Sequence, residues 1–384
     1  MSLRIKLILA FLLVSFVSVG LLATLSINNA SHILQQEIES ALNSLVDEKL
    51  EHIYHYINEK EQAVATSADL PIVVKALEAL SLAFVYGAGS GEYKKQDNIY
   101  RSALNRLRGR YNSYDLFLIS PKGDVVFSVI HEADFATNLK VGQFSDSKLA
   151  RVFTQAASVL ETRVSTFEPY SPSQWRKNKV PKKLNSNKKL SSSIGDEQHS
   201  AFVAAPVFSH DKLIGVLAIQ LNSDDYYYLT QDYSGLKSSG EVLISQLIND
   251  QAVIIAPSRH DPNAAFNLRF NRGASIALPV QQSLSGERGS GLSIGYEGTE
   301  ILAAWRYIPE LKWGVVVKIE SSEAFASVDN LTWNFVLIGF SIVLFTALFA
   351  VFIAYRISRP LLMLVDATKN IAQGQFNKTV TVQS

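Results

Sequence analysis

The residues that could bind a small molecule lie in the middle of the chain, on expected strands and on the loops between them. They offer aromatic rings, hydroxyls, carboxylates, an imidazole and an amide, and ligand pockets combine apolar surface with a few polar groups of this kind. Aromatic residues on strands more often belong to the core, so packing alone is the alternative for several of them. The candidate ligand-binding residues are Tyr114, Phe127, Ser128, His131, Asp134, Phe167, Tyr170 and Gln220.

Three residue types that bind metals come close together at His131, Glu132 and Asp134. Three ligands within four residues rarely share one tetrahedral site, and the sequence has no cysteine and no second histidine cluster beside them. We therefore expect a solvated loop here, with neither a metal ion nor a cofactor.

The sequence also lacks the motifs of common catalytic sites. It contains no nucleophile elbow, no Walker loop, no metalloprotease helix and no glycine-rich dinucleotide turn. The net charge of +1 argues against nucleic-acid binding, which requires a basic surface that displaces counterions from phosphates. We expect no catalytic residue in this chain and no nucleic-acid partner.

Two long runs without a charged residue bracket the candidate site, at 7–27 and at 331–355. A helix rises about 1.5 Å per residue, so each run is long enough to cross a hydrocarbon core of about 30 Å. A cleaved signal peptide is the alternative for the first run, but its apolar core is too long and no small-residue cleavage site follows. The sequence predicts a two-pass protein of the lipid bilayer.

The charges beside the two runs predict which side of the membrane each segment faces. Arg4 and Lys6 precede the first run, and Arg356 and Arg359 follow the second. Short loops that are rich in Lys and Arg stay in the cytoplasm. We expect both termini to be cytoplasmic and residues 28–330 to be external.

The segment after the first span has the pattern of a long amphipathic helix. Residues 30–85 contain no glycine and one proline, and apolar residues recur at helical spacing. This stripe either packs on the following module or also pairs with a second subunit as a signalling stalk, and we expect a homodimer. The stripe consists of Leu42, Val46, Leu50, Ile53, Ile57 and Val64.

Two modules with alternating strands follow the stalk. The first has expected strands at 114–119, 125–129, 165–168, 201–208 and 213–221, with helices at about 97–110 and 147–159. The second has expected strands at 241–247, 252–256, 289–296, 301–307 and 314–319. Helices and paired strands in this order predict an α+β fold with antiparallel sheets, each with helices on one face.

The chain therefore divides into a series of segments. They are a cytoplasmic start (1–6), a first transmembrane helix (7–27), a stalk helix (28–96), a membrane-distal module (97–235), a membrane-proximal module (236–320), a linker helix (321–330), a second transmembrane helix (331–355) and a cytoplasmic segment (356–384). The distal module carries a basic insertion at 175–199, with seven Lys or Arg between Arg176 and Lys189. It is either a solvated connection between strands or a contact with anionic lipid or glycan.

With these segments in place, the chain resembles the double Cache sensors of bacterial transmembrane receptors. That group includes methyl-accepting chemotaxis proteins, sensor histidine kinases and diguanylate cyclases. Residues 357–376, from ISRPL to AQGQF, resemble the start of a HAMP linker. The external stretches that carry the resemblance are 114–139 (YDLFLI to EADFATNL), 167–173 (FEPYSPS), 201–208 (AFVAAPVF), 303–306 (AAWR) and 313–319 (WGVVVKI).

The resemblance implies two tandem PAS-like modules and a small-molecule pocket in the membrane-distal one. It further implies a receptor in the bacterial inner membrane, whose signal passes through the proximal module and the second span to cytoplasmic signalling machinery. Amino-acid-binding members have an Asp in the last strand of the distal module, where this chain has Gln220.

A membrane-anchored external binding or adhesion module, without a signalling role, is the alternative function. Pro360 and the apolar stripe after it predict an ordered helix beyond the second span. An inert anchor has no use for such a helix, so we favour the receptor.

Overall fold

A computed structural model describes residues 3–170, 199–222, 227 and 231–372 of the chain. These residues form two compact units, one of residues 39–321 and one that combines the residues before 39 with those after 321. The basic insertion predicted at 175–199 lies outside the described residues except for its last residue, His199.

The chain begins with consecutive helices through Arg110, but the first helix ends earlier than the sequence pattern predicts. Helix α1 covers Leu3–Ala68, and α2 covers Pro71–Phe84. The expectation of one helix through residue 85 is wrong, because Pro71 forces the preceding Leu70 into an extended conformation and occupies the first turn of a new helix.

Helix α3 covers Gly91–Arg110 and starts earlier than the expected residue 97. Its first turn is capped by Ser90, whose Oγ accepts a hydrogen bond of 3.1 Å from the amide of Tyr93. This is the usual way to satisfy a free amide at a helix start.

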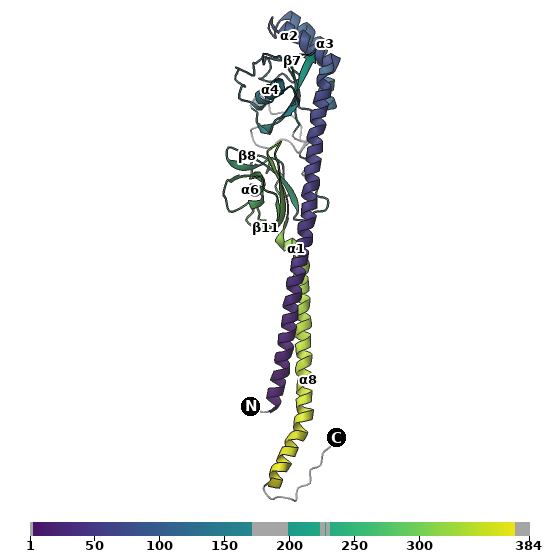
Figure 1. Cartoon of the computed structure of the whole chain (residues 1–384), viewed down its shortest axis with the longest axis vertical. Coiled ribbons are helices and arrows are strands. Elements are labelled where there is room, and N and C mark those ends of the chain that lie inside the picture. Colours follow the sequence, from purple (N-terminus) through teal and green to yellow (C-terminus); the bar gives the residue numbers. More distant parts are fainter. Residues whose placement is uncertain (1–2, 171–198, 223–226, 228–230, 373–384) are drawn as a thin grey trace, which may run out of the picture. The chain divides into compact units, whose positions relative to one another are not determined.

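The distal module contains a five-stranded antiparallel sheet in the order β2-β1-β7-β6-β3. Helix α4, Lys148–Val159, packs on β6 and β7, while α2 and α3 pack on the sheet as well (Figure 1). The strands are β1 (Asp115–Ile119), β2 (Val125–Ser128), β3 (Arg163–Val164), β6 (Phe202–Ser209) and β7 (Lys212–Gln220), with a separate ladder of β4 (Glu168–Pro169) and β5 (His199–Ser200).

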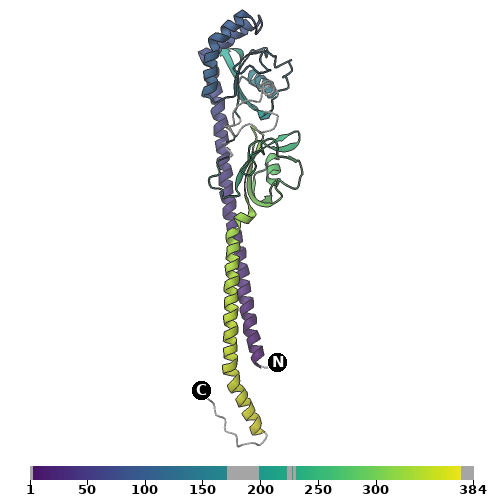
Figure 2. The ribbon, with the colours of Figure 1, turned by 180° about the vertical axis from the view of Figure 1, so that it is seen from behind.

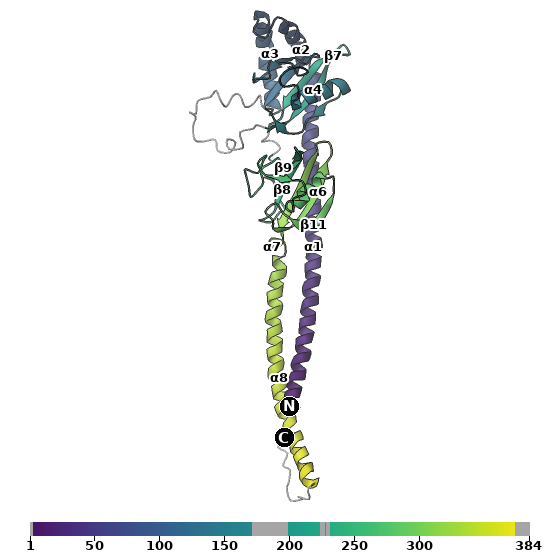
Figure 3. The ribbon, with the colours of Figure 1, turned by 90° about the vertical axis from the view of Figure 1, so that its left-hand side faces the viewer.

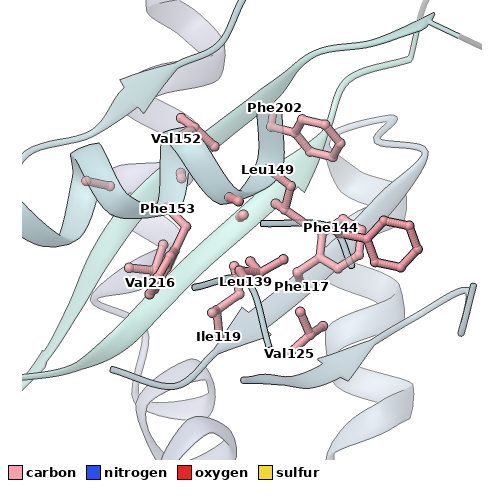
Figure 4. Packing of buried hydrophobic residues seen from close by; sticks show 14 of the residues in the cluster. Phe117, Ile119, Val125, Leu139, Phe144, Leu149, Val152, Phe153, Phe202 and Val216 are labelled. Atoms are coloured by element: carbon pink, nitrogen blue, oxygen red, sulfur yellow. The ribbon is translucent and has the colours of Figure 1, made fainter. Parts of the chain in front are cut away.

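Helices cover both faces of this sheet, so the expectation of helices on one face is wrong. On one face, apolar side chains of α4 pack on Phe117 and Phe202 of the sheet (Figure 4). On the other face lies α2, because its apolar residues Val73, Leu77 and Leu80 are fully buried there. A helix with such a stripe must cover an apolar surface.

The proximal module contains a six-stranded antiparallel sheet in the order β10-β9-β8-β13-β12-β11. Helix α6, Leu278–Leu284, lies over the face that carries Leu243, Trp305 and Val316 (Figure 3). The strands are β8 (Glu241–Ile248), β9 (Gln251–Ile254), β10 (Arg269–Asn271), β11 (Gly289–Ile294), β12 (Glu300–Ile308) and β13 (Trp313–Glu320).

Helix α1 packs along both modules within the larger unit (Figure 2). Of the predicted apolar stripe, every member except the half-buried Leu50 is buried by the chain itself. Polar contacts add to this packing: the Arg306 guanidinium lies 2.7 Å from Asp47, and the Lys49 ammonium lies 2.7 Å from Asp232. The stripe therefore packs on its own modules, and its pairing with a second subunit stays a prediction.

The smaller unit contains the apolar part of α1 and all of α8, Ala326–Ala372. Both helices are long and apolar enough to cross a membrane. The Ser15 and Thr346 hydroxyls lie 3.3 Å apart between them. Large apolar side chains point outward, with Phe16 71% and Phe340 69% exposed. Such a surface suits a lipid environment better than water.

Candidate functional site

Strand alternation places three polar side chains on the face of the distal sheet that α4 covers. Phe117 belongs to the core on that face, and its register partner on β2 is Ser128. Asp115 is two residues before Phe117 and pairs with Gln220 on β7. Residues two apart on a strand share a face, so Asp115, Ser128 and Gln220 meet at one end of the sheet.

Asp115 is the centre of this polar group, and its side chain is fully buried. Its Oδ2 accepts a hydrogen bond of 2.6 Å from the Ser128 hydroxyl. Its Oδ1 accepts bonds from three backbone amides, those of Leu116, Val129 and Ile130. Burial raises the pKa of Asp115 to about 7, although these donors favour the charged form. The carboxylate ties the turn after β2 to strand β1.

The loop after this turn brings two more carboxylates to the same region. The Tyr170 hydroxyl donates a hydrogen bond of 2.6 Å to Oδ2 of the buried Asp134. The Tyr114 hydroxyl donates one of 2.7 Å to Glu132. The pKa of Asp134 is raised to about 6, mainly by burial; the Tyr170 bond lowers it, and the charge of Glu132 raises it.

Five of the eight predicted ligand-binding residues come together here. The contacts above link most of them. In addition, the Gln220 side chain donates a hydrogen bond of 2.7 Å to the Ser200 hydroxyl, and the Tyr170 ring packs edge-on against the Phe202 ring, with 4.8 Å between centroids. The five are Tyr114, Ser128, Asp134, Tyr170 and Gln220.

Two other predicted residues, Phe127 and His131, lie on the side of α3. Phe127 pairs with Leu118 and so faces away from Ser128, and its ring lies 4.8 Å from the Arg101 guanidinium. His131 is exposed, with Nε2 2.7 Å from Arg101 and its ring stacked on Phe135 at 4.0 Å. They form a separate cluster around Arg101.

The eighth residue, Phe167, contacts the proximal module. Its ring lies 5.9 Å from that of Trp313, the first residue of β13. Its carbonyl oxygen accepts a bond of 3.0 Å from Gln246 of β8. Phe167 therefore joins the two modules and does not line the polar group in the distal sheet.

Sequence reasoning missed Asp115. The available signal was an acidic residue directly before the apolar run Leu116 to Ile119, because an acid that continues a buried strand must itself be buried and bonded. Within the described part of the chain, no group of three His, Cys, Asp or Glu side chains is placed to hold a metal ion.

A large groove lies away from this polar group. Its volume is 1210 Å³, and its walls include Tyr54 and Glu61 of α1, Arg151 of α4 and Lys312 of the β12–β13 turn. Burial raises the pKa of Glu61. The groove carries charges of both signs, so its lining alone indicates no particular ligand.

Comparison with known proteins identifies the family. Residues 30–328 match the sequence model of the Cache domain, dCache_1. The chain belongs to the Cache-domain family. The predicted resemblance to double Cache sensors is confirmed, as is the α+β fold with a long N-terminal helix and two antiparallel sheets.

Several sensor domains of known structure are similar to this chain. The sensor domain of the Vibrio cholerae histidine kinase DctB is 14% identical, with a TM-score of 0.50 over 75% of this chain and 98% of that one. The ligand-binding domain of Mlp24 with asparagine is 15% identical, with a TM-score of 0.45 over 79% and 99%. The sensory domain of the Campylobacter jejuni chemoreceptor Tlp3 is 12% identical, with a TM-score of 0.47 over 77% and 98%. At 14% identity, the similarity to the DctB sensor domain shows the fold alone.

Proposed function

We propose that this chain is a receptor subunit of a bacterial inner membrane. Its external Cache modules bind a small molecule in the distal module, and the second span carries the signal to cytoplasmic machinery. The basic residues at both membrane flanks support cytoplasmic termini. The identity of the output, whether chemotaxis, kinase or cyclase, is set by what α8 is connected to in the cytoplasm.

One observation carries this proposal: a central strand of the proximal sheet continues into the second span. Strand β13 lies between β8 and β12, and it ends at Glu320. Only the short α7, Ser321–Ala324, separates it from α8. A displacement of β13 is therefore delivered along the backbone to the helix that crosses the membrane.

The distal module touches the start of this same strand. The Trp313 indole donates a bond of 3.3 Å to the Gln246 side chain, which in turn donates to the Phe167 carbonyl oxygen. All three residues are buried. A shift of the segment that holds Phe167 is thus passed to the first residue of β13, which supports a path from the distal module to the membrane.

Topology is the first test. Alkaline phosphatase is active only outside the cytoplasm, so we expect it to be active when fused after Ser200 and inactive when fused after Ser384. We also expect the protein to stay in the membrane after a carbonate wash. An active fusion after Ser384, or a protein released by carbonate, would contradict the two-pass receptor.

Signalling is tested by cross-linking, for which the chain is well suited because it contains no cysteine. Leu337→Cys and Phe340→Cys place thiols on exposed positions of α8, and Val141→Cys on the distal module is the control for labelling. We expect a disulfide-linked dimer through α8 whose yield changes with a compound that raises Tm in a metabolite screen. A pattern that is identical with and without that compound favours the passive anchor.

A further inference from the structure

The carboxylate of Asp134 has one oxygen that is used and one that is not. Oδ2 accepts the Tyr170 hydroxyl, while Oδ1 has no hydrogen-bond partner although Asp134 is fully buried. The amides of Asp134 and Phe135 lie near enough to lower the pKa, but neither meets the geometry of a hydrogen bond to Oδ1. A buried acceptor left unpaired is costly, so it is rare in a protein interior unless a function retains it.

The charges around this oxygen have one sign. The pKa of Asp115 is raised by the charge of Asp134, and that of Asp134 is raised by the charge of Glu132. Among the described residues, no Lys, Arg or His forms an ion pair or hydrogen bond with the carboxylate of Asp115 or Asp134. The nearby Arg101 is turned to the other face of the sheet, where it forms two bonds to Asp97.

We propose that the ligand of the distal module is a small organic cation, a primary amine or a guanidine, whose N–H group donates to Oδ1 of Asp134. This rests on the receptor function proposed above and names the chemistry of its ligand. An N–H cation supplies both the missing donor and the missing positive charge, and charge-assisted bonds of this kind are the strong ones. A carboxylate or phosphate ligand would meet like charges instead.

Two further features fit an organic cation. The Tyr170 side chain contacts the carboxylate, and the ring of Phe202 packs edge-on against that of Tyr170; aromatic faces attract ammonium and guanidinium groups. The described acids are not arranged to hold a metal ion. Because Asp134 is closed off from solvent, a ligand reaches Oδ1 only when the residues that cover it move. Such movement couples binding to a change in the module.

The test uses the whole chain in lipid nanodiscs and measures Tm and calorimetric binding. The probes are ethanolamine, 1,4-diaminobutane and ethylguanidine, with ethylene glycol and 1,4-butanediol as uncharged counterparts and acetate as an anion. We expect at least one cation to raise Tm, and its affinity to fall about tenfold or more in Asp134→Asn. The matched control is Asp211→Asn, an acid in an exposed turn of the same module with φ 61°, a conformation that Asn also tolerates.

The outcomes separate this inference from the receptor function. Equal affinity of a cation for Asp134→Asn and wild type would overturn the inference, as would binding of only the uncharged probes or acetate. In those cases the receptor function still stands if cross-linking through α8 changes with a bound compound. Tyr170→Phe keeps the ring but removes the hydroxyl that holds Asp134. We expect it to lower the affinity for the cation less than Asp134→Asn does.

Discussion

Replacing Asp134 by Asn should make the ligand-free protein more stable near neutral pH. The wild-type side chain is fully buried, and its Oδ1 has no partner. Asparagine has nearly the same shape and its oxygen still accepts the Tyr170 hydroxyl, but it carries no charge that burial would penalise. A residue that is needed for binding and costs stability is the usual compromise at functional sites.

The magnitude follows from the pKa. Burial raises the pKa of Asp134 from 3.8 to about 6, and about 2 units at 1.36 kcal/mol each amount to about 3 kcal/mol. The shift already includes the Tyr170 bond, but the asparagine NH2 group takes the place of Oδ1, and a buried donor without a partner costs about 1 kcal/mol. The net gain for Asp134→Asn is therefore about 2 kcal/mol, or about 4 to 8 °C in Tm for a unit of this size.

The sign of the pH dependence is fixed by the same shift. Because the folded-state pKa is the higher one, the folded protein holds its proton longer, so wild-type stability falls as pH rises from about 4 to about 6 and then levels off. Asp115, with a pKa raised to about 7, adds a similar slope that extends to about pH 7. Asp134→Asn should reduce the pH dependence of the unfolding free energy between about pH 4 and pH 6, but the pH dependence that comes from Asp115 should remain.

Thermal unfolding of the full chain across this pH range, followed by circular dichroism, measures both effects. Asp211→Asn is again the control and should track the wild type. The reasoning fails if Asp134→Asn lowers Tm near neutral pH, or if its pH profile has the same slope as that of the wild type.

Three other substitutions test contacts that stabilise the fold, and urea unfolding measures the effect of each. Asp47→Asn should cost about 2 kcal/mol, because the Arg306 side chain is only 5% exposed and loses the charge of Asp47. Glu241→Gln should cost about 3 kcal/mol, because it leaves the buried Lys318 ammonium unpaired, and adding Lys318→Met should recover most of the loss. Gly215→Ala should cost about 3 kcal/mol, because its Cβ would collide with a carbonyl oxygen of the neighbouring strand β1 at a backbone φ of 151°.

The fold was largely predictable because its signals are local. The two predicted strands of the first hairpin, 114–119 and 125–129, appear as β1 and β2. The apolar stripe of the stalk is buried, as its spacing predicts. The single proline at 71 was the local signal that the helix prediction ignored. Short elements such as β10 and α6, with three and seven residues, are too brief for a periodic pattern to show.

The site was only partly predictable because it depends on which face each side chain takes. Phe127 and Ser128 are neighbours on one strand, so their side chains take opposite faces of the sheet: Ser128 lies beside Asp115, and Phe127 lies beside Arg101. The position of Phe167 against Trp313 joins residues far apart in the sequence, and no pattern along the chain encodes that contact.

The buried ion pair in the proximal sheet bears on how β13 would move in the proposed receptor. Lys318 and Glu241 are register partners on β13 and β8, their charged groups lie 2.9 Å apart, and both are almost completely buried. Sliding one strand past the other would separate two charges in a medium of low dielectric constant, at a cost of several kcal/mol. Strand β13 is therefore locked to β8, so a push that reaches Trp313 displaces both strands together. The displacement then reaches α8 through the end of β13 moving together with β8, because sliding β13 past β8 costs more free energy.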